Sequence, residues 1–167
     1  MFTLPNLTVR DTRVLELQYK LIHRCHATKS IICKWDQTVN PICPICNSKA
    51  NILHDFYSCP EIQTFWQNIY NMLIQNLEEK LLVPLSMEVV LFGKYRGIKY
   101  DILNHAVLYA KYFIHKQKVQ QKHVLFNQFF TYYKRILDIE KERYIFLDRR
   151  DAFDKRFGTL VKALQMP

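Results

Sequence analysis

The chain of 167 residues carries a net charge of +9, and its residues are 49% hydrophobic and 14% aromatic. This composition provides enough apolar side chain for a buried core and excludes a wholly disordered chain. Its 3 glycines disfavour a turn-rich β-sandwich and favour long helices. No signal peptide is predicted at 1–10, and no transmembrane helix is predicted because Glu88 interrupts the most apolar stretch, 81–92.

Most of the excess positive charge lies in the last third of the chain. Residues 111–167 hold 13 Lys and Arg against 6 Asp and Glu, with aromatic residues interleaved. Such a basic region favours a polyanionic partner, most commonly nucleic acid, and the alternative is an ordinary solvated helical surface. The odd number of cysteines, 5, favours a reducing, intracellular compartment over a disulfide-bonded secreted protein.

The first predicted helix begins at Asp11 or Thr12, since either residue can cap it. Its apolar stripe is predicted to comprise Val14, Leu17, Leu21 and Cys25. A short helical turn is expected at Ser30–Trp35, where Cys33 is interpreted as a buried thiol. A polar loop at 36–40 then leads into the next segment.

The segment from Cys43 to Cys59 has the spacing Cys-x2-Cys-x7-His-x4-Cys, with the ligand-type residues Cys43, Cys46, His54 and Cys59. Two cysteines separated by two residues can approach one ion from a tight turn, and a histidine with a third cysteine can close a tetrahedral site. Thiolates with one imidazole favour Zn²⁺, and four protein ligands leave no open position. The pattern therefore predicts one structural zinc ion. Buried free thiols with a surface histidine are the alternative.

After this pattern, Pro60 fits the first position of a helix that begins beside Cys59. Apolar residues recur along that helix at three- and four-residue steps, namely Ile62, Phe65, Trp66, Ile69, Leu73 and Leu77. The aromatic pair Phe65–Trp66 is predicted to pack under the metal site. Base stacking is the alternative role for Trp66.

Four further helical segments are predicted. Ser86 caps a short helix that Gly93 ends, Asp101 caps a second helix, and a third runs from about Val124 to about Leu147. A final amphipathic segment carries Phe153, Phe157, Leu160, Val161 and Leu164. The sequence thus predicts a mainly α protein, with a helical bundle-like body and a small irregular zinc knuckle inserted between helices. A zinc-knuckle region, 1–80, and a basic, aromatic-rich helical region, 81–167, are expected to pack as one unit.

Basic residues around the predicted knuckle and in the last two thirds of the chain are candidates for contacts with phosphates. These candidates are Lys20, Arg24, Lys29, Lys94, Arg96, Lys111, Lys116, Lys118, Lys134 and Arg135. Aromatic faces such as those of Tyr95 and Tyr133 are candidates for stacking on bases.

The order of residues around the knuckle resembles a known family. Before the cysteine pair stand Leu17-Gln-Tyr-Lys20, Arg24 and Thr28-Lys29, and after it stand His54-Asp-Phe-Tyr-Ser-Cys59-Pro60 and Phe65-Trp66. This arrangement resembles the zinc-binding region at the carboxyl end of reverse transcriptases from LINE-type non-LTR retrotransposons. A looser similarity reaches about Phe157 through Leu91-Phe92-Gly93, Ala110-Lys111 to Ile114, and Glu140.

The resemblance implies a non-catalytic module that lies downstream of a polymerase and helps bind RNA and target DNA during target-primed reverse transcription. Its implied partners are RNA, single-stranded or target DNA, and the polymerase region of the same or a parent protein, in a nuclear or cytoplasmic ribonucleoprotein. The paired-Asp motif of the polymerase is absent from the sequence. The chain is therefore expected to be a carboxyl-terminal fragment or a free-standing remnant, and not an enzyme on its own.

Two other functions compete with this interpretation. The chain can be a scaffold whose zinc knuckle docks on the polymerase. Alternatively, it can be a restriction-like endonuclease, since some relatives carry one after the knuckle, and this requires clustered carboxylates and a lysine around a divalent metal. The candidate clusters are Glu78-Glu79-Lys80 and Asp138, Glu140 and Lys141. Such charged strings also occur commonly on solvated helix surfaces.

Overall fold

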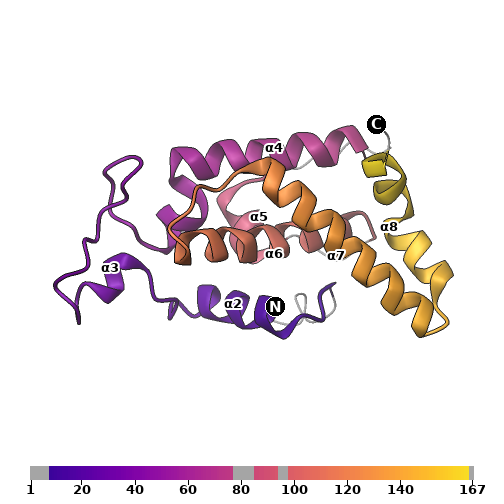
Figure 1. Ribbon diagram of the computed structural model, residues 1–167, viewed down its shortest axis with the longest axis horizontal. Coiled ribbons are helices and arrows are strands. Elements are labelled where there is room, and N and C mark those ends of the chain that lie inside the picture. Colours follow the sequence, from indigo (N-terminus) through magenta and orange to yellow (C-terminus); the bar gives the residue numbers. More distant parts are fainter. Residues whose placement is uncertain (1–7, 77–84, 94–97, 166–167) are drawn as a thin grey trace.

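The computed structural model describes residues 8–76, 85–93 and 98–165 (Figure 1). Its elements in chain order are α2 (Thr12–Ile22), α3 (Lys29–Ile32), the π-helical turn η1 (His54–Ser58), α4 (Pro60–Asn76), α5 (Met87–Phe92), α6 (Ile98–Val119), α7 (Phe126–Phe146) and α8 (Arg150–Gln165). The described residues form no β-strand, and an isolated bridge joins Ile42 to Lys49. The prediction of a mainly α protein with an irregular segment between helices is confirmed.

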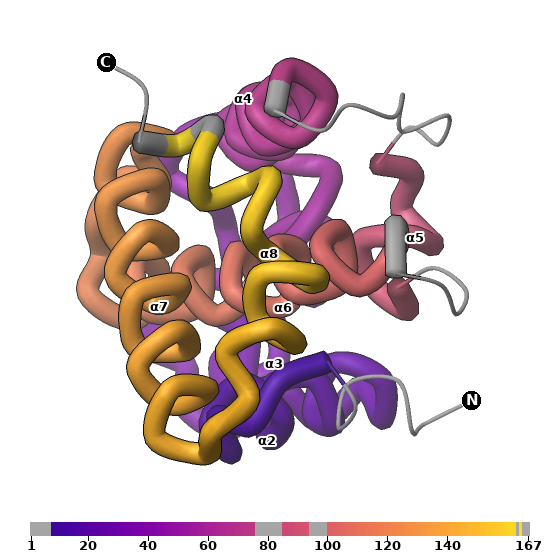
Figure 2. The backbone as a smooth tube through the Cα atoms, turned by 90° about the vertical axis from the view of Figure 1, so that its right-hand side faces the viewer, coloured from indigo at the N-terminus to yellow at the C-terminus, as the bar shows by residue number. Residues whose placement is uncertain are grey.

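Helix α6 is the central element of the body. Every residue from Ile102 to Lys111 is buried, because α6 contacts α2, α7, α8 and η1 on its different sides. Figures 1 and 2 both show α6 between α4 on one side and α2 on the other. A helix that is covered all round must carry apolar side chains all round, and the sequence of α6 meets this requirement at most positions.

Aromatic side chains from several helices fill the core around α6. Phe65 of α4 packs edge-on against Phe129 of α7 and stacks near Phe113 of α6, with ring centroids 5.3 and 6.1 Å apart. Phe153 and Phe157 of α8 are fully buried in the same cluster. Residues from both predicted regions, 1–80 and 81–167, thus contribute to one continuous core.

Several predicted helix ends are confirmed by their caps. The Asp11 carboxylate accepts a 3.0 Å hydrogen bond from the Arg13 amide at the start of α2. The Ser86 hydroxyl accepts from the Val89 amide at the start of α5. Gly93 ends α5 with a φ of +80°, and a Cβ there would lie 3.0 Å from the Asn104 side chain. Both the backbone angle and the close approach therefore favour glycine at this position.

Two sequence predictions about helix ends are wrong. Cys25 was predicted to lie in the apolar stripe of the first helix, but α2 ends at Ile22 and Cys25 is exposed. The chain turns at Arg24, whose φ of +56° cannot continue a helix. Asp101 was predicted to cap a helix, but α6 begins at Ile98. Asp101 instead lies in the first turn and forms a 3.0 Å ion pair with Arg156 of α8.

The segment between α2 and η1 lies at one end of the molecule. In Figure 1, α3 and the loop that follows it occupy the end opposite to α8, beyond the main helical layers. We call residues 28–53 the knuckle lobe. This lobe joins the body through η1 and α4, so the predicted metal ligands lie where the lobe meets the helical core.

Candidate metal centre

The two cysteines of the Cys-x2-Cys pair project from a tight hairpin. The Cys43 amide donates to the Ser48 carbonyl at 2.8 Å, and the Asn47 amide donates to the Cys43 carbonyl at 2.9 Å. Asn47 takes a left-handed φ of +57°, a conformation that asparagine tolerates well. These local bonds bend the chain around Cys43 and Cys46 and direct both thiols to the same side.

The histidine and the third cysteine project from the π-helical turn η1. The Cys59 amide donates to the His54 carbonyl at 3.1 Å, which closes one π-helical turn across five residues. The Asn51 side chain accepts a 2.9 Å hydrogen bond from the His54 amide and fixes the start of this turn. The x4 spacing between His54 and Cys59 therefore brings their side chains to one face.

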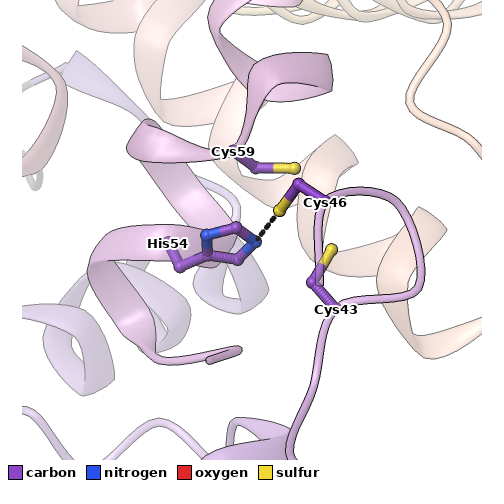
Figure 3. A group of neighbouring side chains, drawn as sticks. All are labelled: Cys43, Cys46, His54 and Cys59. Atoms are coloured by element: carbon purple, nitrogen blue, oxygen red, sulfur yellow. Dashed lines mark hydrogen bonds between the residues drawn. The ribbon is translucent and has the colours of Figure 1, made fainter. Parts of the chain in front are cut away.

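The four predicted ligands converge (Figure 3). Their ligand atoms all lie within 4.8 Å of one another, and Cys46 Sγ is 3.4 Å from His54 Nε2. Zinc–sulfur and zinc–nitrogen bonds of ordinary length set ligand-to-ligand distances of about 3.6–3.8 Å in a tetrahedral site. Cys43, His54 and Cys59 are buried, and Cys46 is partly buried. The cluster can hold a metal ion, and its donors are those that zinc prefers.

The surroundings of the cluster raise the pKa of one candidate ligand and lower the pKa of two others. Burial raises the pKa of the Cys59 thiol to about 11. A hydrogen bond from the Ser48 amide lowers the pKa of Cys46. Burial lowers the pKa of His54, which favours the neutral imidazole that a metal requires. A bound dication would offset the cost of burying Cys59 as a thiolate.

Trp66 supports the turn that carries two of the candidate ligands, as predicted, whereas Phe65 packs against Phe113 and Phe129 in the core. Trp66 is 3% exposed, and its indole Nε1 donates a 2.8 Å hydrogen bond to the Phe56 carbonyl in η1. Phe56 is itself buried and meets the His26 ring edge-on at 5.4 Å. The buried position of Trp66 excludes it as a surface for base stacking.

The candidate phosphate-binding residues are distributed over the lobe and the body, and four of the eight that lie in the described ranges are exposed. Arg24, Lys29, Lys116 and Arg135 are exposed, and Lys134 is partly buried with its ammonium over the Phe130 ring. Two others already have acidic partners, because Lys20 pairs with Glu16 at 2.6 Å and Lys118 lies 3.8 Å from Asp55. Lys94, Arg96 and the aromatic candidate Tyr95 lie outside the described residues.

The predictions that Lys111 contacts a phosphate and that Tyr133 stacks on a base are wrong. Lys111 is 1% exposed, and its ammonium donates to the Gln18 side chain and to the Leu91 carbonyl. Tyr133 is fully buried, and its hydroxyl lies 3.0 Å from His105 Nδ1. Neither side chain can reach a phosphate or a base, because both point into the core between helices.

The candidate carboxylates of a nuclease are not brought together in the described part of the chain. Glu140 is buried and pairs with Arg143 at 2.6 Å, whereas Asp138 is exposed. Glu78, Glu79 and Lys80 lie outside the described residues. Among the side chains that the structure describes, the group that could hold a metal ion is the cluster of three cysteines and one histidine.

A scan against protein-family models gives no match for this chain, and a search of curated proteins gives none either. Among the helices in the described ranges, none combines the length and the apolar character needed to cross a membrane.

Proposed function

We propose that this chain is a non-catalytic nucleic-acid-binding module that is folded around one structural zinc ion. The observation that carries the proposal is the convergence of Cys43, Cys46, His54 and Cys59 from two separate turns. Four protein donors fill a tetrahedral coordination shell, so a zinc ion bound there would have no position left for a substrate. Its role would be to join the Cys43–Cys46 hairpin to the start of α4.

Charge supports nucleic acid as the partner. The chain has a net charge of +9, and exposed basic residues such as Lys29, Lys116 and Arg135 lie on both the knuckle lobe and the body. Basic side chains that neutralise phosphates release counterions, and this gain is independent of base sequence. RNA and single-stranded or target DNA are therefore the partners that we propose.

The resemblance around the knuckle gives this module a proposed origin. We place it in the carboxyl-terminal region of a LINE-type non-LTR reverse transcriptase, downstream of the polymerase. In that setting it would bind element RNA or target DNA during target-primed reverse transcription, inside an intracellular ribonucleoprotein. The Cys-x2-Cys-x7-His-x4-Cys spacing and the Phe65–Trp66 pair support this placement.

The metal is tested by measuring zinc content and thermal stability under reducing conditions. The wild type should hold one zinc per chain, and Cys46→Ser should lose it. Cys25→Ser is the matched control, because Cys25 is an exposed cysteine outside the cluster. Chelation should lower the melting temperature of the wild type and of Cys25→Ser. A wild-type chain that holds no zinc and keeps its stability with chelator would contradict the metal site.

Nucleic-acid binding is tested with the zinc-loaded chain and short RNA and single-stranded DNA oligonucleotides. The logarithm of the affinity should fall linearly with the logarithm of the salt concentration, because several phosphates are neutralised. Undetectable binding, or binding that is insensitive to salt, would reject this function while leaving the zinc site intact.

A protein-interaction scaffold is the second candidate, and one observation favours it. The end of α7 exposes three consecutive apolar side chains, Ile145, Phe146 and Leu147, and Phe146 is 89% exposed. Such a surface can contact a protein partner, for which the polymerase region is our candidate. Capture of that region by the wild type, lost in Phe146→Asp, together with an absence of nucleic-acid binding, would favour the scaffold.

A further inference from the structure

The two tryptophans of the chain lie in opposite environments. Trp66 is 3% exposed in the core, whereas Trp35 in the knuckle lobe is 77% exposed. Exposing a large indole to water costs free energy. An exposed tryptophan therefore either has no binding role or forms part of a binding surface. Trp35 stands beside Lys34, at the edge of a polar loop.

The backbone that carries Trp35 is held in a defined turn. The Trp35 and Asp36 amides both donate to the Ile32 carbonyl at 2.9 Å, directly after α3. The Asp36 carboxylate then accepts hydrogen bonds from the Thr38 amide and hydroxyl at 3.0 and 2.6 Å. The position of the Trp35 backbone is thus fixed by local bonds, while its ring remains in solvent.

This turn is connected to the candidate metal hairpin. The Ser30 amide in α3 donates to the Ala50 carbonyl at 3.1 Å, and the Ala50 amide donates to the Pro41 carbonyl at 2.8 Å. An isolated bridge between Ile42 and Lys49 also joins the two arms of the hairpin. Folding of the hairpin around its ligands therefore also orders the start of the turn that presents Trp35.

The charged residues of the knuckle lobe are mostly lysines. Residues 29–49 contain Lys29, Lys34 and Lys49, and Asp36 is their single acidic residue. Each of these lysines is exposed, and none has an acidic partner within 4 Å in the part of the chain that the structure describes. The Asp36 carboxylate accepts its hydrogen bonds from Thr38. The lobe therefore combines an open aromatic face with exposed lysines that form no ion pair within 4 Å among the described residues.

We infer that Trp35 stacks on an unpaired base of single-stranded nucleic acid, and that Lys29, Lys34 and Lys49 neutralise the flanking phosphates. This inference rests on the proposed function and adds the contact surface to it. A single strand fits this surface because its bases offer open faces, whereas duplex bases are already stacked on one another. A protein partner would suit Trp35 but not the three lysines, because protein–protein interfaces are enriched in tryptophan and depleted of lysine.

The test compares a base-containing oligonucleotide with an abasic one of the same length and charge. Both are titrated into the zinc-loaded full chain and into Trp35→Ala, Trp35→Phe and Phe146→Ala. Phe146 is the matched control, since it is an exposed aromatic residue at the end of α7 and lies outside the knuckle lobe. Trp35→Ala should weaken binding to the base-containing strand by about 5- to 160-fold, as expected for the loss of one stacked base. Trp35→Phe should retain most of the affinity, and Phe146→Ala should retain all of it.

Two further readouts separate stacking from charge. Trp35→Ala should leave both the affinity for the abasic strand and the salt dependence unchanged, whereas Lys34→Ala should reduce the salt slope by about 0.7, the value for one phosphate contact on a single strand. The base-containing strand should also quench the fluorescence of the wild type more than that of Trp35→Ala, because Trp66 is buried.

The outcomes distinguish this inference from the proposed function. If the wild type binds both strands and Trp35→Ala loses nothing, or loses equally on both, the stacking role is wrong and the module remains a nucleic-acid binder. If the wild type binds neither strand, the proposed function itself fails. Loss of binding to the polymerase region in Trp35→Ala, with unchanged affinity for the oligonucleotides, would assign this surface to a protein instead.

Discussion

The indole Nε1 of Trp66 in α4 donates a 2.8 Å hydrogen bond to the backbone carbonyl of Phe56 in η1. Phe56 lies between His54 and Cys59, the two candidate ligands that η1 and its end provide. The bond therefore ties the turn that carries these ligands to the helix that begins at Pro60. Stability of the core and geometry of the cluster are coupled through this contact.

We expect Trp66→Phe to destabilise the zinc-loaded chain by about 2–4 kcal/mol. The change removes a buried hydrogen bond and leaves a partly unfilled space in the core. Zinc affinity should fall as well, because binding free energy and folding free energy are linked in such sites. Urea unfolding measures the first effect, and competition with a chromogenic chelator measures the second.

Trp35→Phe is the control for this prediction, since that tryptophan is exposed and should change stability by less than about 0.5 kcal/mol. An unchanged unfolding free energy in Trp66→Phe would show that the contact with Phe56 does not support the turn.

A second prediction concerns Lys111, which burial inside the body holds at a pKa of about 7. An unfolded lysine titrates near pH 10.4, so between about pH 7 and pH 10 the unfolded chain binds one more proton than the folded chain. The stability of the wild type should therefore rise with pH in this window. Lys111→Met should be more stable than the wild type at pH 7. The ratio of the folding equilibrium constant of the variant to that of the wild type should then fall by about tenfold for each pH unit of increase within this window.

The matched control is Lys116→Met, an exposed lysine on the same helix. Lys111→Met should leave oligonucleotide affinity unchanged, whereas Lys116→Met should weaken it. Denaturation curves at pH 7 and pH 9 and a titration at fixed salt measure both quantities. Weaker oligonucleotide binding by a well-folded Lys111→Met chain would contradict the buried position of the ammonium.

The burial of Lys111 could not be predicted from the sequence, whereas the metal ligands and several helices could. The local pattern predicted the four metal ligands because their spacing determines their geometry within single turns, as the η1 bond between His54 and Cys59 illustrates. The helices with regular apolar spacing and good caps, such as Ser86, were predicted for the same local reason. The burial of Lys111 depends instead on α2 and α5, which cover α6 through contacts with Gln18 and Leu91.

Tyr133 and Cys25 also show that a local sequence pattern does not decide whether a side chain is buried or exposed. Tyr133 was a reasonable stacking candidate from sequence, because aromatic residues on a basic helix fit both a core and a binding surface. Its position against His105, 28 residues earlier, decides for the core. Cys25 was predicted to continue an apolar stripe, and the left-handed Arg24 prevents this. Such a backbone angle has no clear signal in a sequence that lacks glycine or asparagine there.

The last prediction concerns His105, which is buried between α6, α7 and α8. Its Nδ1 lies 3.0 Å from the Tyr133 hydroxyl, and its Nε2 has no hydrogen-bond partner among the described residues. Burial, with smaller contributions from Arg156 and Arg143, lowers the pKa of His105 to about 3. An unfolded histidine titrates near pH 6.5, so between about pH 6.5 and pH 3 the unfolded chain binds the extra proton. The wild type should lose about tenfold in its folding equilibrium constant per pH unit on acidification through this window.

His105→Phe should remove this loss, so that the variant gains on the wild type as the pH falls from 6.5 to 4. Tyr133→Phe is the matched control, because it removes the hydrogen bond but leaves the buried imidazole, and it should keep the acid sensitivity of the wild type. Comparing the variants at each pH cancels the protonation of the candidate metal ligands and of His26, whose pKa burial lowers to about 4. Urea unfolding at pH 6.5, 5 and 4 measures the effect. Parallel pH profiles for the wild type and His105→Phe would show that His105 is protonated in the folded chain and is not sealed in the core.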